Sequence, residues 1–331
     1  MKKILTLALA LITLVPALKA QDENKATVDE AIKATTDAKS DLTKVAVDEN
    51  KYWKLSGVVS MNASATGLWN WAAGGNNNAT GIAGAILTLN YKKNRLAWST
   101  ILDTEYGLSY IEDTYYEWQK ASDKLNLTTK LGYELAPKWY LTALASFRTQ
   151  YTSGYTYATD HRDYISDWLA PSYTDVSIGI DWIPNDIVSL YLSPIAGRIT
   201  TAVTDSAALR SSYLGADYGT IDPITNRWIN EDDYKFEFGA TFKAQAQYEP
   251  VKNLKLISTL SLFTPYTENF GNIDVDWDMA ISYQFLKVLN VKLGTTLKYY
   301  DSVLIADKNG NNPHQRVQFK AVLGLGIGYS F

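Results

Sequence analysis

The sequence predicts an all-β fold, a transmembrane antiparallel up-and-down β-barrel of about 12 strands that follows a short N-terminal leader. Three observations support this fold class: apolar and polar residues alternate over long stretches, short and long connections alternate along the chain, and aromatic residues recur at one end of the predicted strands. After the N-terminus, no apolar run approaches the roughly 18 residues of a membrane-spanning helix, which excludes a helical membrane protein.

The first 50 residues differ from the rest of the chain. Residues 1–20 have the form of a secretory signal peptide, with Lys2 and Lys3 before an apolar core and Ala20 at the expected cleavage site. Residues 21–50 contain no aromatic residue and only a weak helical pattern. We therefore expect a solvated periplasmic leader, helical or disordered, with a plug or a peptidoglycan contact as the alternative. Residues 51–331 are expected to form the barrel.

The composition narrows the possible functions. The chain has 331 residues, a formal net charge of −4 and no cysteine. A mildly acidic balance argues against binding the phosphate backbone of nucleic acids. Without cysteine, disulfides, thiolate metal sites and cysteine nucleophiles are excluded.

Alternation with a period of two is clearest in residues 235–248 and 273–285. Phe236, Phe238 and Phe242 alternate with polar residues, and because successive side chains of a strand point to opposite faces, one face is apolar and the other polar. Such runs exceed the usual five or six residues of a strand and suit a tilted strand that crosses a membrane. The predicted strands cover approximately residues 53–66, 79–91, 95–110, 124–135, 139–151, 172–182, 187–199, 235–248, 254–265, 272–285, 290–300 and 315–331.

The connections between these segments alternate in length. Those at 92–94, 136–138, 183–186, 249–253 and 286–289 are short, whereas those at 67–78, 111–123, 152–171, 200–234, 266–271 and 301–314 are mostly much longer. Bacterial outer-membrane barrels combine short periplasmic turns with long extracellular loops in this way.

Aromatic residues mark the short-turn ends of the predicted strands on the apolar face. This predicts a periplasmic girdle, because an amphipathic ring prefers the level of the lipid headgroups. Its expected members are Trp53, Tyr91, Tyr133, Trp139, Trp182, Tyr248, Phe285 and Phe331. The last strand carries Ile327, Tyr329 and Phe331 on the same face and resembles the C-terminal signal read by the outer-membrane assembly machinery, so we expect this machinery and outer-membrane lipids as partners.

The chain also resembles a Bacteroidetes outer-membrane family known as domain of unknown function 3078. The residues that carry the resemblance are 70–75 (NWAAGG), 149–151 followed by Gly154 and Tyr155, 165–171 (ISDWLAP), 192–194, 272–277 and 318–331. The resemblance implies an outer-membrane location and supplies no catalytic residue.

Asp274, Asp276 and Asp278 form the sharpest charge cluster on the predicted lumen face. A tight turn at 286–289 is expected to place Asp278 opposite Lys298 and Gln284 opposite Lys292. Three readings are open: ion pairs that close the barrel, which we favour, a selective pore, and a metal site. The metal site is disfavoured because Ca²⁺ requires six or more oxygen ligands.

One predicted outer loop combines Trp69 and Trp71 with Gly74 and Gly75. We favour a tight turn with tryptophans at the headgroups; stacking on a carbohydrate is the alternative.

No catalytic, cofactor or metal site is predicted. The only histidines, His161 and His314, fall in two outer loops, and no predicted strand contains a histidine that could activate a strand serine. The sequence therefore favours a passive channel or transporter for small polar solutes over a non-transporting structural or partner-binding barrel, with an outer-membrane hydrolase third. A surface lipoprotein is a candidate partner over residues 200–234.

Overall fold

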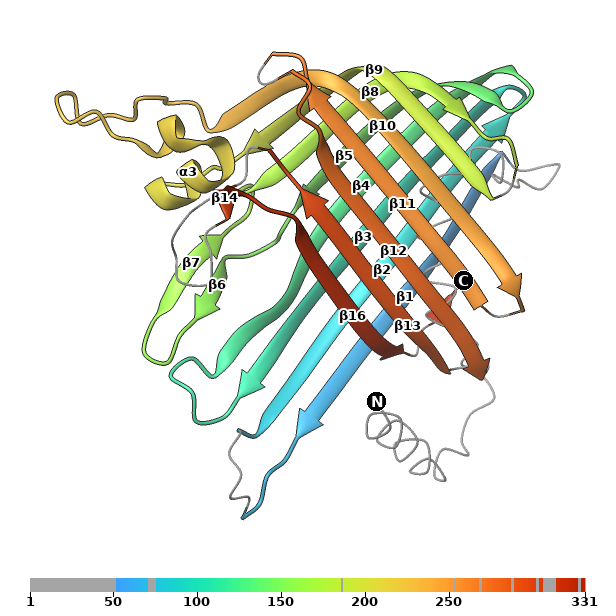
Figure 1. The fold of residues 1–331 in the computed structure, drawn as a ribbon. Coiled ribbons are helices and arrows are strands. Elements are labelled where there is room, and N and C mark those ends of the chain that lie inside the picture. The colour runs from blue at the N-terminus through green and yellow to red at the C-terminus, as the bar shows by residue number, and fades with distance from the viewer. Residues whose placement is uncertain are drawn as a thin grey trace.

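The computed structural model describes residues 52–70, 76–185, 187–252, 254–267, 270–286, 289–301, 304–305, 314–326 and 329–330. The predicted signal peptide and periplasmic leader lie outside these residues. Figure 1 shows a single sheet of long, slanted strands that curls around on itself.

The main sheet is an antiparallel meander in which most neighbours in sequence are also neighbours in space. In the described residues its 13 strand segments follow the order β16-β13-β12-β11-β10-β9-β8-β5-β4-β3-β2-β1-β17. The segments are β1 Trp53–Thr66, β2 Asn78–Lys93, β3 Leu96–Ile111, β4 Trp118–Ala136, β5 Trp139–Thr149, β8 Ser172–Trp182, β9 Val188–Thr201, β10 Tyr234–Val251, β11 Leu254–Pro265, β12 Asp274–Leu286, β13 Leu289–Tyr299, β16 Gln318–Gly326 and β17 Tyr329–Ser330.

The C-terminal segment pairs with both edges of this meander. β16 pairs with β13, and β17 pairs with β1 through Val58↔Ser330 and Val59↔Tyr329. Only two residues separate β16 from β17 in the sequence, so the last strand is shared by the two ends of the sheet. Closure removes the unpaired edge that hydrocarbon would penalise. The predicted fold class, an up-and-down antiparallel barrel of about 12 strands, is confirmed.

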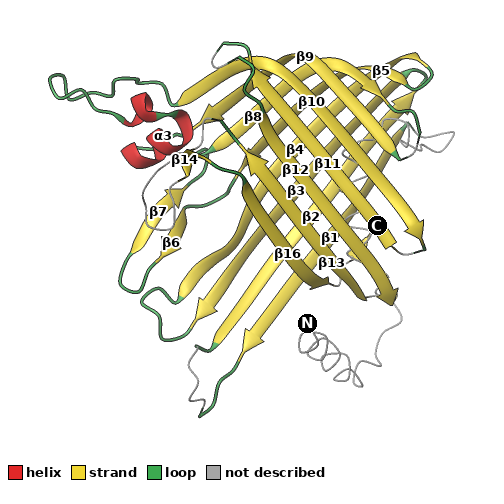
Figure 2. Ribbon diagram, in the orientation of Figure 1, coloured by secondary structure: helices red, strands yellow, loops and turns green. Residues whose placement is uncertain are grey.

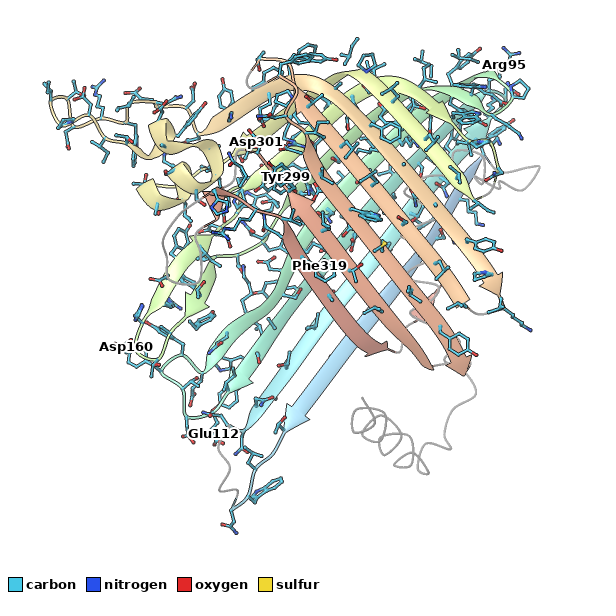
Figure 3. The ribbon with its side chains drawn as sticks, viewed as in Figure 1. Arg95, Glu112, Asp160, Tyr299, Asp301 and Phe319 are labelled. Carbon is cyan, nitrogen blue, oxygen red and sulfur yellow. The ribbon has the colours of Figure 1, made fainter. Side chains whose placement is uncertain are left out.

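The two faces of the sheet have opposite character, and the apolar face is the outer one. Met61 is 77% exposed, Phe319 66% and Leu192 57%, whereas Thr142 and Ser193 are fully buried on the inner face. Figure 3 shows Phe319 on the outside of the barrel. A water-soluble protein distributes its residues the other way, so this surface fits an apolar solvent.

One strand interrupts the alternation. In β9, Ser193 and Pro194 lie opposite the single residue Gly179 of β8, which makes a β-bulge. Pro194 has no N–H, so the unpaired position leaves no donor without a partner. A side chain at Gly179 would collide with the Leu192 carbonyl. The bulge shifts the parity of β9, and Arg198 consequently faces the lumen.

The long connections gather at one end of the barrel and carry additional elements (Figure 2). Residues 150–171 form the hairpin β6 Gly154–Tyr157 and β7 Arg162–Ser166; residues 202–233 contain the helix α3 Ala207–Leu214 and the 3₁₀ turn η1 Ala216–Gly219; and β14 Leu304–Ile305 pairs with β15 His314–Gln315. Ser206 caps α3 by accepting a hydrogen bond from Leu209 N. Figure 3 labels Glu112 and Asp160 at this long-loop end and Arg95 at the opposite end.

Within the described part of the chain, no helix has both the length and the apolar character needed to cross a membrane.

Candidate functional site

A cavity of about 290 Å³ lies inside the barrel and is lined mainly by inward-facing residues of β3 to β13. Its charged lining residues are Asp103, Lys130, Arg148, Asp175, Arg198, Lys243, Asp276, Asp278 and Lys298. Ligand pockets for small molecules start at about 300 Å³, so this cavity suits a solute of modest size.

Arg198 is the centre of an ion-pair network on one wall of the cavity. Its Nε lies 3.0 Å from Asp175 Oδ1, and its Nη1 lies 2.8 Å from Asp274 Oδ2. Because β10 and β11 separate β9 from β12, the arginine reaches across two strands to Asp274. Arg148 approaches Asp175 at 3.7 Å, and the ring of Phe263 packs under the Arg198 guanidinium at 4.2 Å. A planar guanidinium that bridges two carboxylates fixes the relative position of their strands.

Asp276, rather than Asp278, lies opposite Lys298. The pairing of β12 with β13 is displaced by two residues from the predicted register, and it shifts between Gln284 and Leu286, next to the hairpin turn. Lys298 Nζ lies 3.1 Å from Asp276 Oδ1, and Tyr300 donates its hydroxyl to the same carboxylate. The prediction that Asp278 lies opposite Lys298 was therefore wrong, although a displacement by two keeps both side chains on the lumen face.

The other predicted lysine of this cluster, Lys292, lies opposite Ser282 and not Gln284. Its side chain is outside the described part of the structure. Among the described residues, no group of three His, Asp or Glu side chains is arranged to hold a metal ion.

A second network lies nearer the short-turn end of the lumen. Lys130 of β4 forms an ion pair with the fully buried Asp181 of β8, and Ser189 donates a 2.9 Å hydrogen bond to the same carboxylate. The hydroxyl of Tyr191 donates to Ser177 at 2.9 Å. Lys130 and Asp181 thus neutralise each other, and Asp181 has the hydrogen bond from Ser189 in addition, which offsets part of the cost of removing the two charges from water.

Lys243 and Asp278 differ from these paired residues. Within the described residues, neither has an ion-pair partner, and the structure gives Lys243 no hydrogen bond. Asp278 accepts one hydrogen bond, at 2.6 Å from the hydroxyl of Thr296. Both side chains line the cavity. Among the described charged residues that line the cavity, only Lys243 and Asp278 have no ion-pair partner. Their charges have opposite signs.

A compact hydrogen-bonded cluster covers the long-loop end beside β5. The Asp167 carboxylate accepts from Tyr164 OH at 2.9 Å, from Ser153 Oγ at 3.0 Å and from Trp168 N at 2.8 Å. Burial opposes ionisation of Asp167, but these three hydrogen bonds outweigh it and hold its pKa below the usual value of 3.8. Burial and the bond to Asp167 together raise the pKa of Tyr164.

The segments 149–151 and 165–171, which both carry the family resemblance, meet in this cluster. The amide of Gln150 donates to the carbonyls of Asp167 and Ala170, and Thr149 Oγ1 accepts from Leu169 N at 3.1 Å. The end of β5 is thereby attached to the segment 165–171.

The 202–233 loop is organised by the buried Arg210. Its guanidinium forms an ion pair with Asp233 and donates to the carbonyls of Tyr218, Asn230 and Asp232. Trp228 stacks on it at 4.9 Å. These contacts give the loop a defined fold, and Tyr213 attaches it to the neighbouring loop by donating its hydroxyl to the Ile165 carbonyl at 2.8 Å.

At the short-turn end, the predicted girdle residues form pairs on the outer face. Trp53 lies 4.8 Å from Tyr91 and 5.5 Å from Trp98, and Trp139 stacks on Trp182 at 5.5 Å. Tyr133 and Tyr248 are about half exposed there. The side chains of Phe285 and Tyr329, together with Ile327 and Phe331, lie outside the described residues.

Of the predicted loop candidates, only Trp69 is described. It is 85% exposed, and its ring lies over Gly67. Trp71, Gly74 and Gly75 are outside the described residues. Asn77 attaches the described part of this loop to the next one. Its side-chain oxygen accepts a hydrogen bond from Leu68 N, and its amide group donates to the Glu112 carboxylate, both at 2.5 Å.

The sequence-based prediction missed Arg198, Asp175 and Trp98. Asp175 and Trp98 have the parity of the lumen and outer faces respectively, so alternation alone could have identified them. Arg198 could not be found in this way, because counting from Leu190 and Leu192 places it on the lipid face and only the bulge turns it inward.

Residues 63–155 match the family model described as a protein of unknown function (DUF3078). No curated protein matches the chain.

Among solved structures, the chain is similar to an outer membrane channel from Pseudomonas putida F1, with 14% identity, a TM-score of 0.36, and coverage of 86% of this chain and 100% of that one. It is also similar to the translocator domain of the autotransporter NalP from Neisseria meningitidis, with 10% identity, a TM-score of 0.37, and coverage of 94% and 100%. The barrel assignment follows from the strand pairing of this chain itself.

Proposed function

We propose that the protein is a channel in the outer membrane of a Gram-negative bacterium, and that it passes small polar solutes. The observation that carries this proposal is the charged cavity inside a barrel whose outer surface is apolar. An apolar outer face and paired aromatic residues at one end support a position in a lipid bilayer. A charged lumen supports the passage of solutes that the bilayer excludes.

The distribution of charges favours a channel over a purely structural barrel. Buried charges are costly unless they are paired, and Arg198, Asp274, Lys130 and Asp181 follow that rule. Lys243 and Asp278 line the cavity without an ion-pair partner among the described residues, and Asp278 is exposed to the lumen; such charges suit contact with water and solutes. A non-transporting barrel would gain nothing from these two groups.

Further elements of the proposal concern origin and partners. The resemblance of the motifs at 70–75 and 165–171 supports an origin in Bacteroidetes. The outer-membrane assembly machinery would recognise the C-terminal residues 327–331, and a surface lipoprotein remains a candidate partner of the 202–233 loop. We propose no catalytic activity: His161 is exposed and contacts Asp160 and Asp163 rather than a serine.

Single-channel recording in planar lipid bilayers tests this function. The purified, folded protein should produce discrete conductance steps, and it should make liposomes permeable to arabinose, a small uncharged sugar. Protein that has been heat-unfolded before reconstitution is the control and should do neither. Absence of both conductance and swelling with folded protein would refute the channel and favour the structural barrel.

A further inference from the structure

We infer that the lumen cavity binds small zwitterions, such as amino acids or short peptides, with Lys243 contacting the carboxylate and Asp278 contacting the ammonium group. The inference deepens the proposed channel function and rests on it for its biological meaning. Binding itself can be measured whether or not the solute passes through.

The first step of the argument is that Lys243 is available to an anion. It projects from β10 into the lumen between Tyr191 of β9 and Ser261 of β11, neither of which is acidic. The charges that act on it most strongly are Asp175 and three cations, Arg148, Lys130 and Arg198. Asp175 already pairs with Arg198 and Arg148. Lys243 therefore lies in a surplus of positive charge that a carboxylate would relieve.

The second step concerns Asp278. Its neighbours across the sheet are Thr259 of β11 and Thr296 of β13, and neither is charged. The hydroxyl of Thr296 satisfies one carboxylate oxygen at 2.6 Å. The side chain is exposed to the lumen. Its second oxygen is therefore open to an ammonium group from a solute.

The third step is the spacing of the two groups. In the sheet register, Lys243 lies opposite Ser261, which lies opposite Asp276, and Asp278 is two residues further along β12. Two strand spacings and two residue rises place the Cα atoms of Lys243 and Asp278 about 12 Å apart. Both side chains border the same cavity of about 290 Å³. The space between their charged ends is that of one small molecule with a charge of each sign.

Among the described residues that line the cavity, the other carboxylates already have cationic partners, which makes the pair selective. Asp276 is held by Lys298 and Tyr300, and Asp103 is held by Lys124 at 2.8 Å. A molecule with only a negative or only a positive charge would satisfy one of the two open groups and leave the other exposed. A zwitterion satisfies both, and an uncharged sugar satisfies neither.

Calorimetric titration with glycylglycine tests the binding site in the purified, folded protein. Wild type should bind glycylglycine and not arabinose. Lys243→Met and Asp278→Asn should each weaken glycylglycine binding about tenfold, the effect of losing one charge-assisted hydrogen bond of roughly 1.4 kcal/mol. Lys124→Met is the matched control: it removes a lumen lysine that is paired with Asp103, and it should leave binding unchanged.

Two further variants keep the test decisive. Lys243→Arg preserves the positive charge and should retain glycylglycine binding. The double variant Lys243→Asp with Asp278→Lys exchanges the two charges, so it should also bind glycylglycine, with the carboxylate and ammonium ends of the dipeptide exchanged. Folding of each variant is checked by its shift in gel migration on heating. Unchanged glycylglycine affinity in folded Lys243→Met and Asp278→Asn would overturn the inference.

Liposome swelling separates this inference from the proposed function. Arabinose swelling with no effect of the two variants on dipeptide binding would leave the channel standing and refute the zwitterion site. Dipeptide binding that depends on Lys243 and Asp278, without swelling or conductance, would support the site and refute the channel.

Discussion

Replacing Arg198 with methionine should lower the free energy of unfolding by about 3 kcal/mol. The substitution removes the two charge-assisted hydrogen bonds to Asp175 and Asp274, each worth roughly 1.5–3 kcal/mol. We expect the loss of stability to lie at the lower end of the range that the two bonds give together, for two reasons. The carboxylates are 24% and 14% exposed, so water in the cavity can solvate them in part, and Asp175 retains Arg148 at 3.7 Å.

Urea titration of the protein in lipid vesicles, with the folded fraction followed by its gel migration, measures this loss. Asp274→Asn is the partner variant in a double-mutant cycle. Asp274→Asn should lower the free energy of unfolding in the wild-type background and lower it much less in Arg198→Met, because the Arg198–Asp274 pair is already broken there. The difference is a coupling energy of about 1–2 kcal/mol. Arg198→Lys keeps the positive charge but loses the planar guanidinium that donates to both carboxylates, so its loss of stability should be intermediate. Strictly additive effects, or an Arg198→Met variant as stable as wild type, would refute this account of the lumen network.

Two further predictions concern the loop cluster and the bulge. The pKa of Asp167 is lower in the folded protein than its usual value of 3.8. Its ionised carboxylate therefore contributes fully to stability above pH 3.8, and this contribution is lost as the pH falls through the pKa of the folded state. Wild type should therefore resist pepsin near 165–171 just above pH 3.8 and be cut only at lower pH, whereas Asp167→Asn should be cut already at the higher pH. Identical profiles would contradict the role of the carboxylate. Gly179→Ala should lower the free energy of unfolding by about 1–3 kcal/mol in the urea titration, because its methyl group meets the Leu192 carbonyl. Gly81→Ala, where a methyl group meets nothing, serves as the control. Equal stability of the two variants would show that the bulge can relax.

The strands were predictable because membrane-spanning strands must alternate strictly over their full length. Residues 53–66, 172–182 and 254–265 have the observed limits, and the others differ mainly at their ends. Alternation also placed Asp276, Asp278 and Lys298 on the lumen face. It could not determine which of the two aspartates lies opposite Lys298, since a displacement by two residues leaves every side chain on the same face.

The remaining features depend on contacts that a single sequence does not reveal. The Arg198 network requires the bulge at Ser193 and Pro194, and a proline in a strand marks such a position without stating how the parity changes afterwards. The cluster around Asp167 joins Ser153, Tyr164 and Trp168 through hydrogen bonds whose partners lie in different parts of an irregular loop. No periodic pattern predicts such a loop.

The bulge in β9 also determines where this chain can change length. Within a regular barrel strand, inserting or deleting one residue would exchange the lipid and lumen faces of everything that follows, so changes in pairs or changes in loops are the only tolerated ones. Ser193 and Pro194 are an exception, since here one residue has been added and the second half of the strand carries the opposite parity. In an alignment of related barrels, a single-residue gap at this position would therefore separate chains that place a basic residue in the lumen at position 198 from chains that present that position to lipid.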